Sequence, residues 1–366
     1  MKKFSSYVRY VIILGVLVTT AFWACSKNNE GNSYFGAIKE VDFATSMGKG
    51  SNEFQSVLAN AEDVERYNLL QKMYDDNLPS KVKNADVAKI PKIIHQIWLG
   101  PSLPPPYFST FQEKWKELHP DWKYCLWTDS DLSSLDVELR DLIEASPNYA
   151  EKSDILRCEL LDKFGGVYLD CDMECHHVLD DLHHKYDFYA GAEYPHKIAT
   201  TNNHLWVGIS IMASRPGHPI MKRWREYIRK RWEMVNDKYS SGVERVINHT
   251  FFPFTFSVLE KCREQSLTNI VFPATYFYPI TSANAAKRQK SIRGIREKFY
   301  DFLENINLKK KRLFAQACPE SLAVHYWGNT WIGGPKDQVK ELYIQVDFLK
   351  RELYRLQQKI QVIEKG

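Results

Sequence analysis

The chain is 366 residues long, with 44% hydrophobic and 13% aromatic residues and a formal net charge of +4. This composition excludes a disordered or low-complexity chain, and the length allows one large domain with accessory segments. The net charge is too small to indicate nucleic acid as a partner, and none is predicted.

Residues 1–25 have the pattern of a signal peptide or a signal anchor. Three basic residues precede an uncharged run over 10–24 that ends at Cys25. The run is short for a spanning helix, which needs about 20 residues, although a start at Val8 allows an uncleaved anchor. The Ala-Cys pair also resembles the end of a bacterial lipoprotein signal. Both alternatives predict a membrane-anchored protein, in a Golgi-type lumen if eukaryotic and as a lipoprotein or inner-membrane protein if bacterial.

Residues 26–89 are mostly polar and are predicted to form a stem or linker. One stretch within them, from Glu53 to Tyr74, carries apolar residues at helical spacing. The main domain is predicted to cover 90–334, where β-rich runs alternate with helical patterns. That alternation indicates an α/β fold with a mainly parallel sheet. The predicted strands are Ile93 to Trp98, Tyr124 to Trp127, Val167 to Leu169, Phe188 to Ala192 and Val207 to Ala213.

A helix is predicted between Ser146-Pro147 and Gly165. The serine supplies an N-cap, the proline suits the first turn, and the glycine provides a C-terminal stop. On this helix Asp154 and Arg157 lie three residues apart and share one face.

Asp170 and Asp172 end the short strand that follows Gly165-Gly166. Because side chains alternate along a strand, both carboxylates are expected to point the same way, at the strand end where open α/β sheets bind ligands. Paired carboxylates with no basic neighbour in sequence repel unless a cation lies between them, and oxygen ligands favour Mn²⁺ or Mg²⁺. Such an ion would bridge a diphosphate and stabilise a departing nucleoside diphosphate.

These segments together resemble the DXD-containing sugar transferases of the yeast initiating α-1,6-mannosyltransferase type (glycosyltransferase family 32), and more distantly the clostridial glucosylating toxins. The resemblance covers Ile90 to Trp331. It is carried by Ile90-Pro-Lys-Ile-Ile-His-Gln-Ile-Trp98 with Gly100, Leu126-Trp-Thr-Asp129, Ser153-Asp-Ile-Leu-Arg157, Gly165-Gly-Val-Tyr-Leu-Asp-Cys-Asp172 and His325 to Trp331.

The resemblance implies a GT-A nucleotide-sugar transferase fold over 90–334, a retaining transfer and a Mn²⁺-dependent donor site. The implied residues are Asp154, Arg157, Asp170 and Asp172 as catalytic, Trp98, Asp154, Arg157, Asp170, Asn329, Thr330 and Trp331 as donor-binding, and Asp170, Asp172 and His325 as metal-binding. By the same resemblance Trp98 stacks on the nucleotide base, Asp154 accepts from sugar hydroxyls and Arg157 contacts the phosphates. The alternatives are a structural helix pair for Asp154 and Arg157, and core positions for Trp98 and Trp331.

Three further segments leave alternatives open. Apolar residues from Val339 to Ile363 follow spacings of three and four. They predict a coiled-coil-like helix over 335–366 and a homo-oligomer through 339–363, or else a helix packed on the main domain. The stretch 287–312 has ten Lys or Arg against three acids, which suits an amphipathic helix on anionic lipid or a solvated surface helix. The aromatic-rich segment 249–255 either shapes an acceptor pocket or is core.

The function predicted from these observations is metal-dependent transfer of a hexose, whether mannose, galactose or glucose, from a nucleotide sugar to a glycan or glycolipid. Two alternatives remain at the sequence level. One is a sugar-nucleotide-binding scaffold without catalysis, and the other is a hydrolase that uses water as acceptor.

Overall fold

The computed structural model describes residues 36–198, 200–235, 242–262, 266–281 and 318–327. The chain divides into two compact units, 1–37 and 38–366, and the elements below belong to the second. The predicted signal segment 1–25, the basic stretch 287–312 and the helix 335–366 lie outside the described residues. Within the described ranges, the structure has no helix with the length and apolar character needed to span a membrane.

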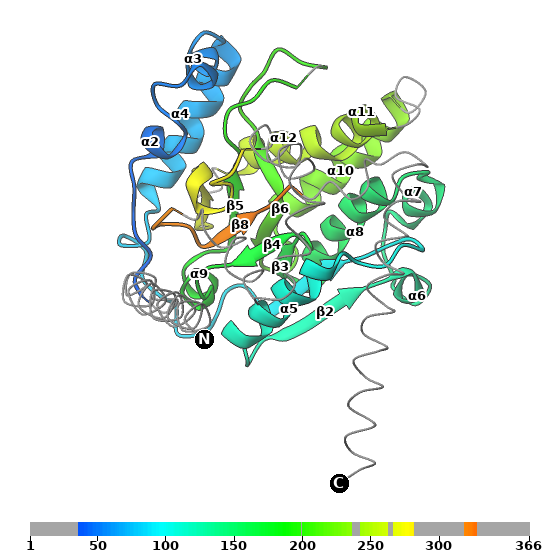
Figure 1. Cartoon of the computed structure of the whole chain (residues 1–366). Helices are drawn as coiled ribbons and strands as arrows, with labels where there is room; N and C mark the ends of the chain where they lie inside the picture. Colours follow the sequence, from blue (N-terminus) through cyan, green and yellow to red (C-terminus); the bar gives the residue numbers. More distant parts are fainter. Residues whose placement is uncertain (1–35, 199, 236–241, 263–265, 282–317, 328–366) are drawn as a thin grey trace, which may run out of the picture. The chain divides into compact units, whose positions relative to one another are not determined.

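Six of the described strands form one sheet in the order β2-β1-β3-β6-β5-β7 (Figure 1). All five strands expected from the sequence are present, because short apolar runs bounded by polar turns are a strong strand signal. The bounds are β1 Ile93–Ile97, β2 Lys123–Trp127, β3 Gly166–Leu169, β5 Phe188–Ala192, β6 Val207–Ser214 and β7 Asn269–Phe272.

The sheet is mixed, with one strand reversed. β1 is parallel to β2 and β3, and β5 is parallel to β7. β6 is antiparallel to both of its neighbours, β3 and β5. The prediction of a mainly parallel sheet therefore holds apart from β6, whose direction an apolar run does not encode.

A second, two-stranded sheet brings distant parts of the chain together. β4 (Met173–Cys175) pairs antiparallel with β8 (Ala323–His325), and Met173 is the partner of His325. The pairing places the end of β8 beside the turn that leaves β3, as Figure 1 shows in green and orange.

The first helices of the described chain precede β1, and the other helices and helical turns lie between the strands along the chain. They are α2 Phe43–Ser46, α3 Asn52–Leu58, α4 Ala61–Asp76, α5 Pro106–Leu118, α6 Asp129–Leu132, α7 Arg140–Ala145, α8 Tyr149–Phe164, α9 Asp180–Lys185, α10 Pro219–Val235, α11 Gly242–Val246, the π-helix η1 Ile247–Phe251, α12 Phe252–Lys261 and the 3-10 turn η2 Ala274–Tyr276. α10 packs against α8, η1 and α12.

Helix α8 begins later than the sequence predicts. Its N-cap is Asn148, whose side chain accepts hydrogen bonds from the backbone of Ala150 and Glu151. The expected cap, Ser146, lies two residues before it, and its hydroxyl accepts from the Asn148 amide instead. The prediction of Ser146 as the N-cap is wrong because Asn148 offers an equally good acceptor closer to the helix.

The glycine pair between α8 and β3 has a steric cause. Gly165 and Gly166 have φ of +64° and +99°, in the region that side chains rarely adopt. A Cβ atom on Gly166 would also lie 2.6 Å from the carbonyl oxygen of Ile93 on β1. The pair therefore allows β3 to leave the helix sharply and still lie directly beside β1.

Much of the segment predicted as a stem packs in the same unit as the sheet. Phe43, Val57 and Tyr74 are buried in the main core, and the Tyr74 hydroxyl lies 2.9 Å from that of Tyr276. The predicted helical stretch is two helices, α3 and α4, separated at Asn60, which caps α4. This compact unit begins at Ile38, whereas the sequence analysis placed the start of the main domain at residue 90.

Candidate active site

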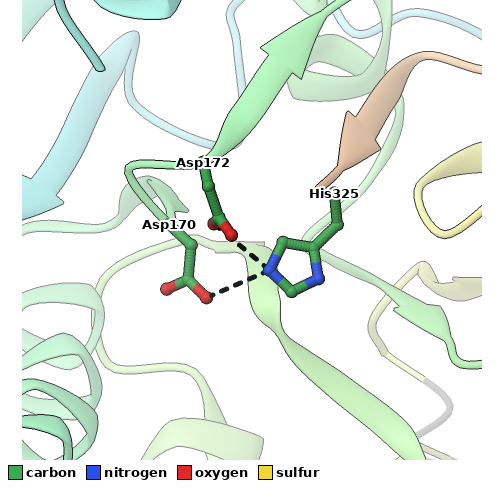
Figure 2. Close-up of side chains that lie close together, drawn as sticks. All are labelled: Asp170, Asp172 and His325. Atoms are coloured by element: carbon green, nitrogen blue, oxygen red, sulfur yellow. Dashed lines mark ion pairs between the residues drawn. The ribbon is translucent and has the colours of Figure 1, made fainter. Parts of the chain in front are cut away.

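Two carboxylates and one imidazole converge after β3. Asp170 and Asp172 lie in the turn between β3 and β4, and His325 ends β8. Nε2 of His325 lies 3.2 Å from an oxygen of Asp172 and 3.8 Å from an oxygen of Asp170. Figure 2 shows the three side chains pointing toward one another. The carboxylates converge as predicted, but they do so from a turn rather than from the strand itself.

This donor set fits a hard divalent cation. One atom from each of Asp170, Asp172 and His325 lies within 4.8 Å of the others. Two carboxylate oxygens and an imidazole nitrogen suit Mn²⁺, and carboxylates also suit Mg²⁺. His325 is buried, and although burial lowers the pKa of its imidazole, the carboxylates of Asp172 and Asp170 raise it above the ordinary value.

Arg157 provides the acidic pair with a cationic neighbour that is distant in sequence. Its Nη1 lies 3.1 Å from Oδ1 of Asp170, and its Nη2 lies 2.8 Å from Oδ1 of Asp154. The Tyr168 hydroxyl donates to the same Asp170 oxygen at 2.7 Å. Asp170 thus uses one oxygen for Arg157 and Tyr168 and turns the other toward His325.

The Arg157 guanidinium is fixed on every side. It donates to the backbone oxygens of Ile209, at 2.7 Å, and Ser153, at 3.3 Å. Its plane lies over the ring of Tyr168, 4.1 Å from the ring centroid. A buried charge held by this many partners keeps one orientation, so the contact with Asp170 is a defined feature of the site.

Asp154 lies next to Arg157 on the buried face of α8. Burial raises the pKa of its carboxyl to about 6, against the opposing effects of Arg157 and of a hydrogen bond from Thr250. Asp154 and Arg157 thus form an ion pair within α8, and Arg157 also contacts Asp170. A structural role for this helix pair is therefore compatible with a role in donor binding.

A cavity of about 570 Å³ opens beside these groups. Its polar end includes Asp154, Arg157 and the three converging side chains. Trp98 does not line it: the indole donates to the Ser102 oxygen at 2.6 Å and stacks on Phe108 with ring centroids 6.1 Å apart. Asn329, Thr330 and Trp331 lie outside the described residues.

Apolar side chains form a wall of the cavity. They are those of Ile198, Ile209, Val246, Ile247 and Phe251. Phe251 belongs to the aromatic-rich segment 249–255, for which the sequence left two alternatives, an acceptor pocket or the core. Its side chain is buried and is also part of this wall.

The sequence analysis missed several cavity residues, among them Glu193 and Trp327. Glu193 is 4% exposed and follows β5 directly, and its carboxyl pKa is raised by burial. An acidic residue immediately after a buried strand was an available signal, since Asp170 follows β3 in the same way. Trp327 has φ of +55°, which a bulky residue rarely adopts, and no sequence pattern announces it.

Residues 105–189, which include the acidic pair, match the family described as "Glycosyltransferase sugar-binding region containing DXD motif". The resemblance to the DXD-containing sugar transferases is confirmed. The matched DXD region runs from α5 through the acidic turn to the start of β5.

Two curated relatives share this DXD region. Inositol phosphoceramide mannosyltransferase 3 of Schizosaccharomyces pombe is 32% identical over 151 residues, which are 40% of this chain and 39% of the relative. Mannosyl phosphorylinositol ceramide synthase SUR1 of Saccharomyces cerevisiae is 30% identical over 165 residues, 42% of this chain and 40% of the relative. The chain therefore spans about two fifths of the length of these relatives.

Among solved structures, the fold resembles one titled "PaToxG Glycosyltransferase". The TM-score is 0.37 at 16% sequence identity, over 57% of this chain and 79% of that one.

Proposed function

We propose that this chain is a metal-dependent, retaining glycosyltransferase of the GT-A type that moves a hexose from a nucleotide sugar to a glycolipid or glycan. The observation that carries the proposal is the convergence of Asp170, Asp172 and His325 inside a DXD sugar-transferase region. Their oxygen and nitrogen atoms would hold Mn²⁺ or Mg²⁺. The bound ion would supply a positive charge against the diphosphate of the donor.

The chain's own residues would orient the donor beside that ion. Arg157 offers a charged, rigid fork at the polar end of the cavity, which suits a phosphate or a sugar oxygen. The buried Asp154 accepts hydrogen bonds and would take one from a sugar hydroxyl. Trp98 remains the proposed stacking residue for the base, at the end of β1 and outside the cavity.

The names of the relatives favour mannose as the sugar and an inositol phosphoceramide as the acceptor class. The apolar wall of the cavity suits the lipid-proximal part of such an acceptor, because apolar surface that loses contact with water stabilises binding. A membrane-anchored location would bring the site to a lipid acceptor. That location and the oligomer through 339–363 remain proposals from the sequence.

The test is Mn²⁺-dependent release of nucleoside diphosphate by the full chain. The donor panel is GDP-mannose, UDP-galactose and UDP-glucose, each with and without an inositol-containing phospholipid as acceptor. The full chain is used because the packed segment from Ile38 onward belongs to the same unit as the site. The inactive variant is the double change Asp170→Asn and Asp172→Asn. The matched control is Asp121→Asn with Asp136→Asn, whose side chains are 62% and 99% exposed.

Release from one donor that requires Mn²⁺, increases with acceptor and is lost only in the first double variant supports the proposal. Release that does not respond to any acceptor, with free sugar as the product, identifies a hydrolase instead. Donor binding without release would leave the scaffold alternative. Neither release nor metal-dependent donor binding from any donor would contradict the proposal.

A further inference from the structure

The π-helix η1 reaches the polar end of the active-site cavity through helix α8. Nδ1 of His249 lies 2.6 Å from Oε1 of Glu151, and the Thr250 hydroxyl donates to Oδ2 of Asp154. Glu151 and Asp154 lie three residues apart and so face the same side of α8. The wider turn of a π-helix allows two consecutive residues to meet them, and such turns are rare and frequent at functional sites.

Helix α10 holds this π-turn from its other side. The indole of Trp224 donates to the backbone oxygen of Thr250 at 2.8 Å, and Nε of Arg231 donates to that of Asn248 at 3.0 Å. Thr250 and Trp224 are fully buried. Side chains from a third element thus satisfy backbone groups of the irregular turn and fix the position of Thr250.

From Thr250, a continuous series of contacts leads to Asp170. The Thr250 hydroxyl lies near two acceptors, the backbone oxygen of Val246 at 2.7 Å and, by a shorter contact, one oxygen of Asp154. The other oxygen of Asp154 binds Arg157. Arg157 in turn binds Asp170. Every member except Asp170 is at most 5% exposed, so water does not replace a lost partner easily.

We propose that Thr250 is a positioning residue for the transfer reaction: its hydroxyl fixes the carboxylate of Asp154, which holds Arg157 in the orientation that meets Asp170 and the donor. This inference rests on the proposed function for its link to the donor, while the positioning of Arg157 concerns the protein alone. Thr250 does not line the cavity, so it acts through Asp154 rather than by contact with substrate.

The hydroxyl is required because, among the residues that the structure describes, Thr250 is the hydrogen-bond donor to the second oxygen of Asp154. Without it, a buried carboxylate oxygen is left unpaired, which is costly enough to make the group turn toward another donor. Arg157 already binds the other oxygen of Asp154, so a turn of this carboxylate would draw the guanidinium away from Asp170. The neighbouring residue Glu151 joins α8 to η1 through His249 and to α11 through Arg245. These contacts are separate from those of Arg157 with Asp154 and Asp170.

The test compares Thr250→Val, which removes the hydroxyl at nearly constant volume, with Thr250→Ser, which keeps it. Thr255→Val is the matched control. Thr255 is 1% exposed, and its hydroxyl accepts from the Val207 amide, outside the series that leads to Asp170. Three properties are measured on the full chain: thermal unfolding, steady-state release of nucleoside diphosphate, and the crystal structure of the Thr250→Val variant.

The expected result is a kcat/KM about tenfold or more lower in Thr250→Val, recovered in Thr250→Ser and unchanged in Thr255→Val, at similar unfolding temperatures for the two valine variants. The crystal structure is expected to show Arg157 displaced from Asp170. Equal kinetics for the two valine variants would overturn the proposal.

If the wild-type chain releases no nucleoside diphosphate from any donor, the proposed function fails, and the crystal structure alone decides the positioning role. Arg157 unmoved in Thr250→Val would then overturn it, and Arg157 displaced would support it.

Discussion

Arg157 and Asp170 come from a helix and a turn that are adjacent in the fold, and their side chains meet at 3.1 Å beside the cavity. The arginine binds Asp154 at the same time, so a single guanidinium joins the helix pair to the acidic pair. Arg157 binds one oxygen of Asp170, and the other oxygen of Asp170 faces His325.

The first prediction concerns the shape of the Arg157 side chain. In Arg157→Lys the charge remains, but one ammonium group cannot contact Asp154, Asp170 and the Ile209 oxygen together. We expect kcat/KM for the sugar nucleotide to fall by about 100-fold. The control is Arg229→Lys, at a side chain that is 38% exposed and pairs with Asp141. Equal rates for the two variants would show that charge alone is enough at position 157.

The second prediction tests whether α4 is part of the folded unit. Asp63 is fully buried and accepts hydrogen bonds from the side chain of Asn203 and the amides of His204 and Leu205. Asp63→Ala leaves these donors unpaired and is expected to lower the free energy of unfolding by about 3 kcal/mol. Urea unfolding measures this, with the exposed Glu65→Ala on the same helix as control. A change below that of the control would contradict the packing of α4.

The third prediction concerns the glycine pair. Gly166 and Gly50 both have positive φ, but a Cβ on Gly50 meets nothing within 4 Å, whereas one on Gly166 meets β1. Both alanine variants carry the backbone strain, and only Gly166→Ala adds a clash. We expect the free energy of unfolding of Gly166→Ala to be about 2 kcal/mol lower than that of Gly50→Ala. It should also lose transferase activity, because the Gly166 strand leads directly to Asp170.

The fourth prediction is a loss of stability in mild acid. Burial lowers the pKa of His95 and of His218 to about 4 and that of His183 to about 3. Because the unfolded chain takes up protons at these groups first, their stabilising contribution is present above about pH 6.5 and is lost as the pH falls toward 4. Each of these histidines is expected to lower the free energy of unfolding by about 2 kcal/mol at pH 5, compared with neutral pH.

The measurement compares urea unfolding at pH 7 and pH 5 for the wild type and for His218→Gln, which removes one of the three groups. The difference between the two pH values should shrink by about 2 kcal/mol in the variant. An unchanged difference would mean that His218 is not held neutral in the folded chain.

The sequence contained most of the sheet because its strands are short apolar runs that need no distant information. β3 was predicted for this reason, and so was the convergence of the two aspartates that follow it. The reversal of β6 was not predictable in the same way, because an apolar strand buried on both faces has the same pattern in either direction.

The predicted stem illustrates a different difficulty. Helix α4 buries Tyr67, Leu70 and Tyr74 but carries many charged residues on its other face. An amphipathic helix of this kind looks the same in sequence whether it packs on a domain or lies in a linker. Its burial depends on partners such as Tyr276, about 200 residues later, which no local pattern reveals.

The part of the site that sequence reasoning missed is held together by long-range contacts. Thr250 meets Asp154 from a π-turn, a local irregularity with no composition signal. Arg157 and Asp170 were both predicted as site residues, but their direct contact was not, because no basic residue is near the acidic pair in sequence.

The most direct test of the central claim is a Mn²⁺ titration of the full chain, followed by electron paramagnetic resonance of the free ion. The wild type is compared with His325→Ala, with the double change Asp170→Asn and Asp172→Asn, and with the control His184→Ala on α9. We predict one saturable site in the wild type and the control, binding about tenfold or more weaker in His325→Ala, and none in the double variant. Equal Mn²⁺ binding by the wild type and the double variant would contradict the assignment of this site as the metal centre of a glycosyltransferase.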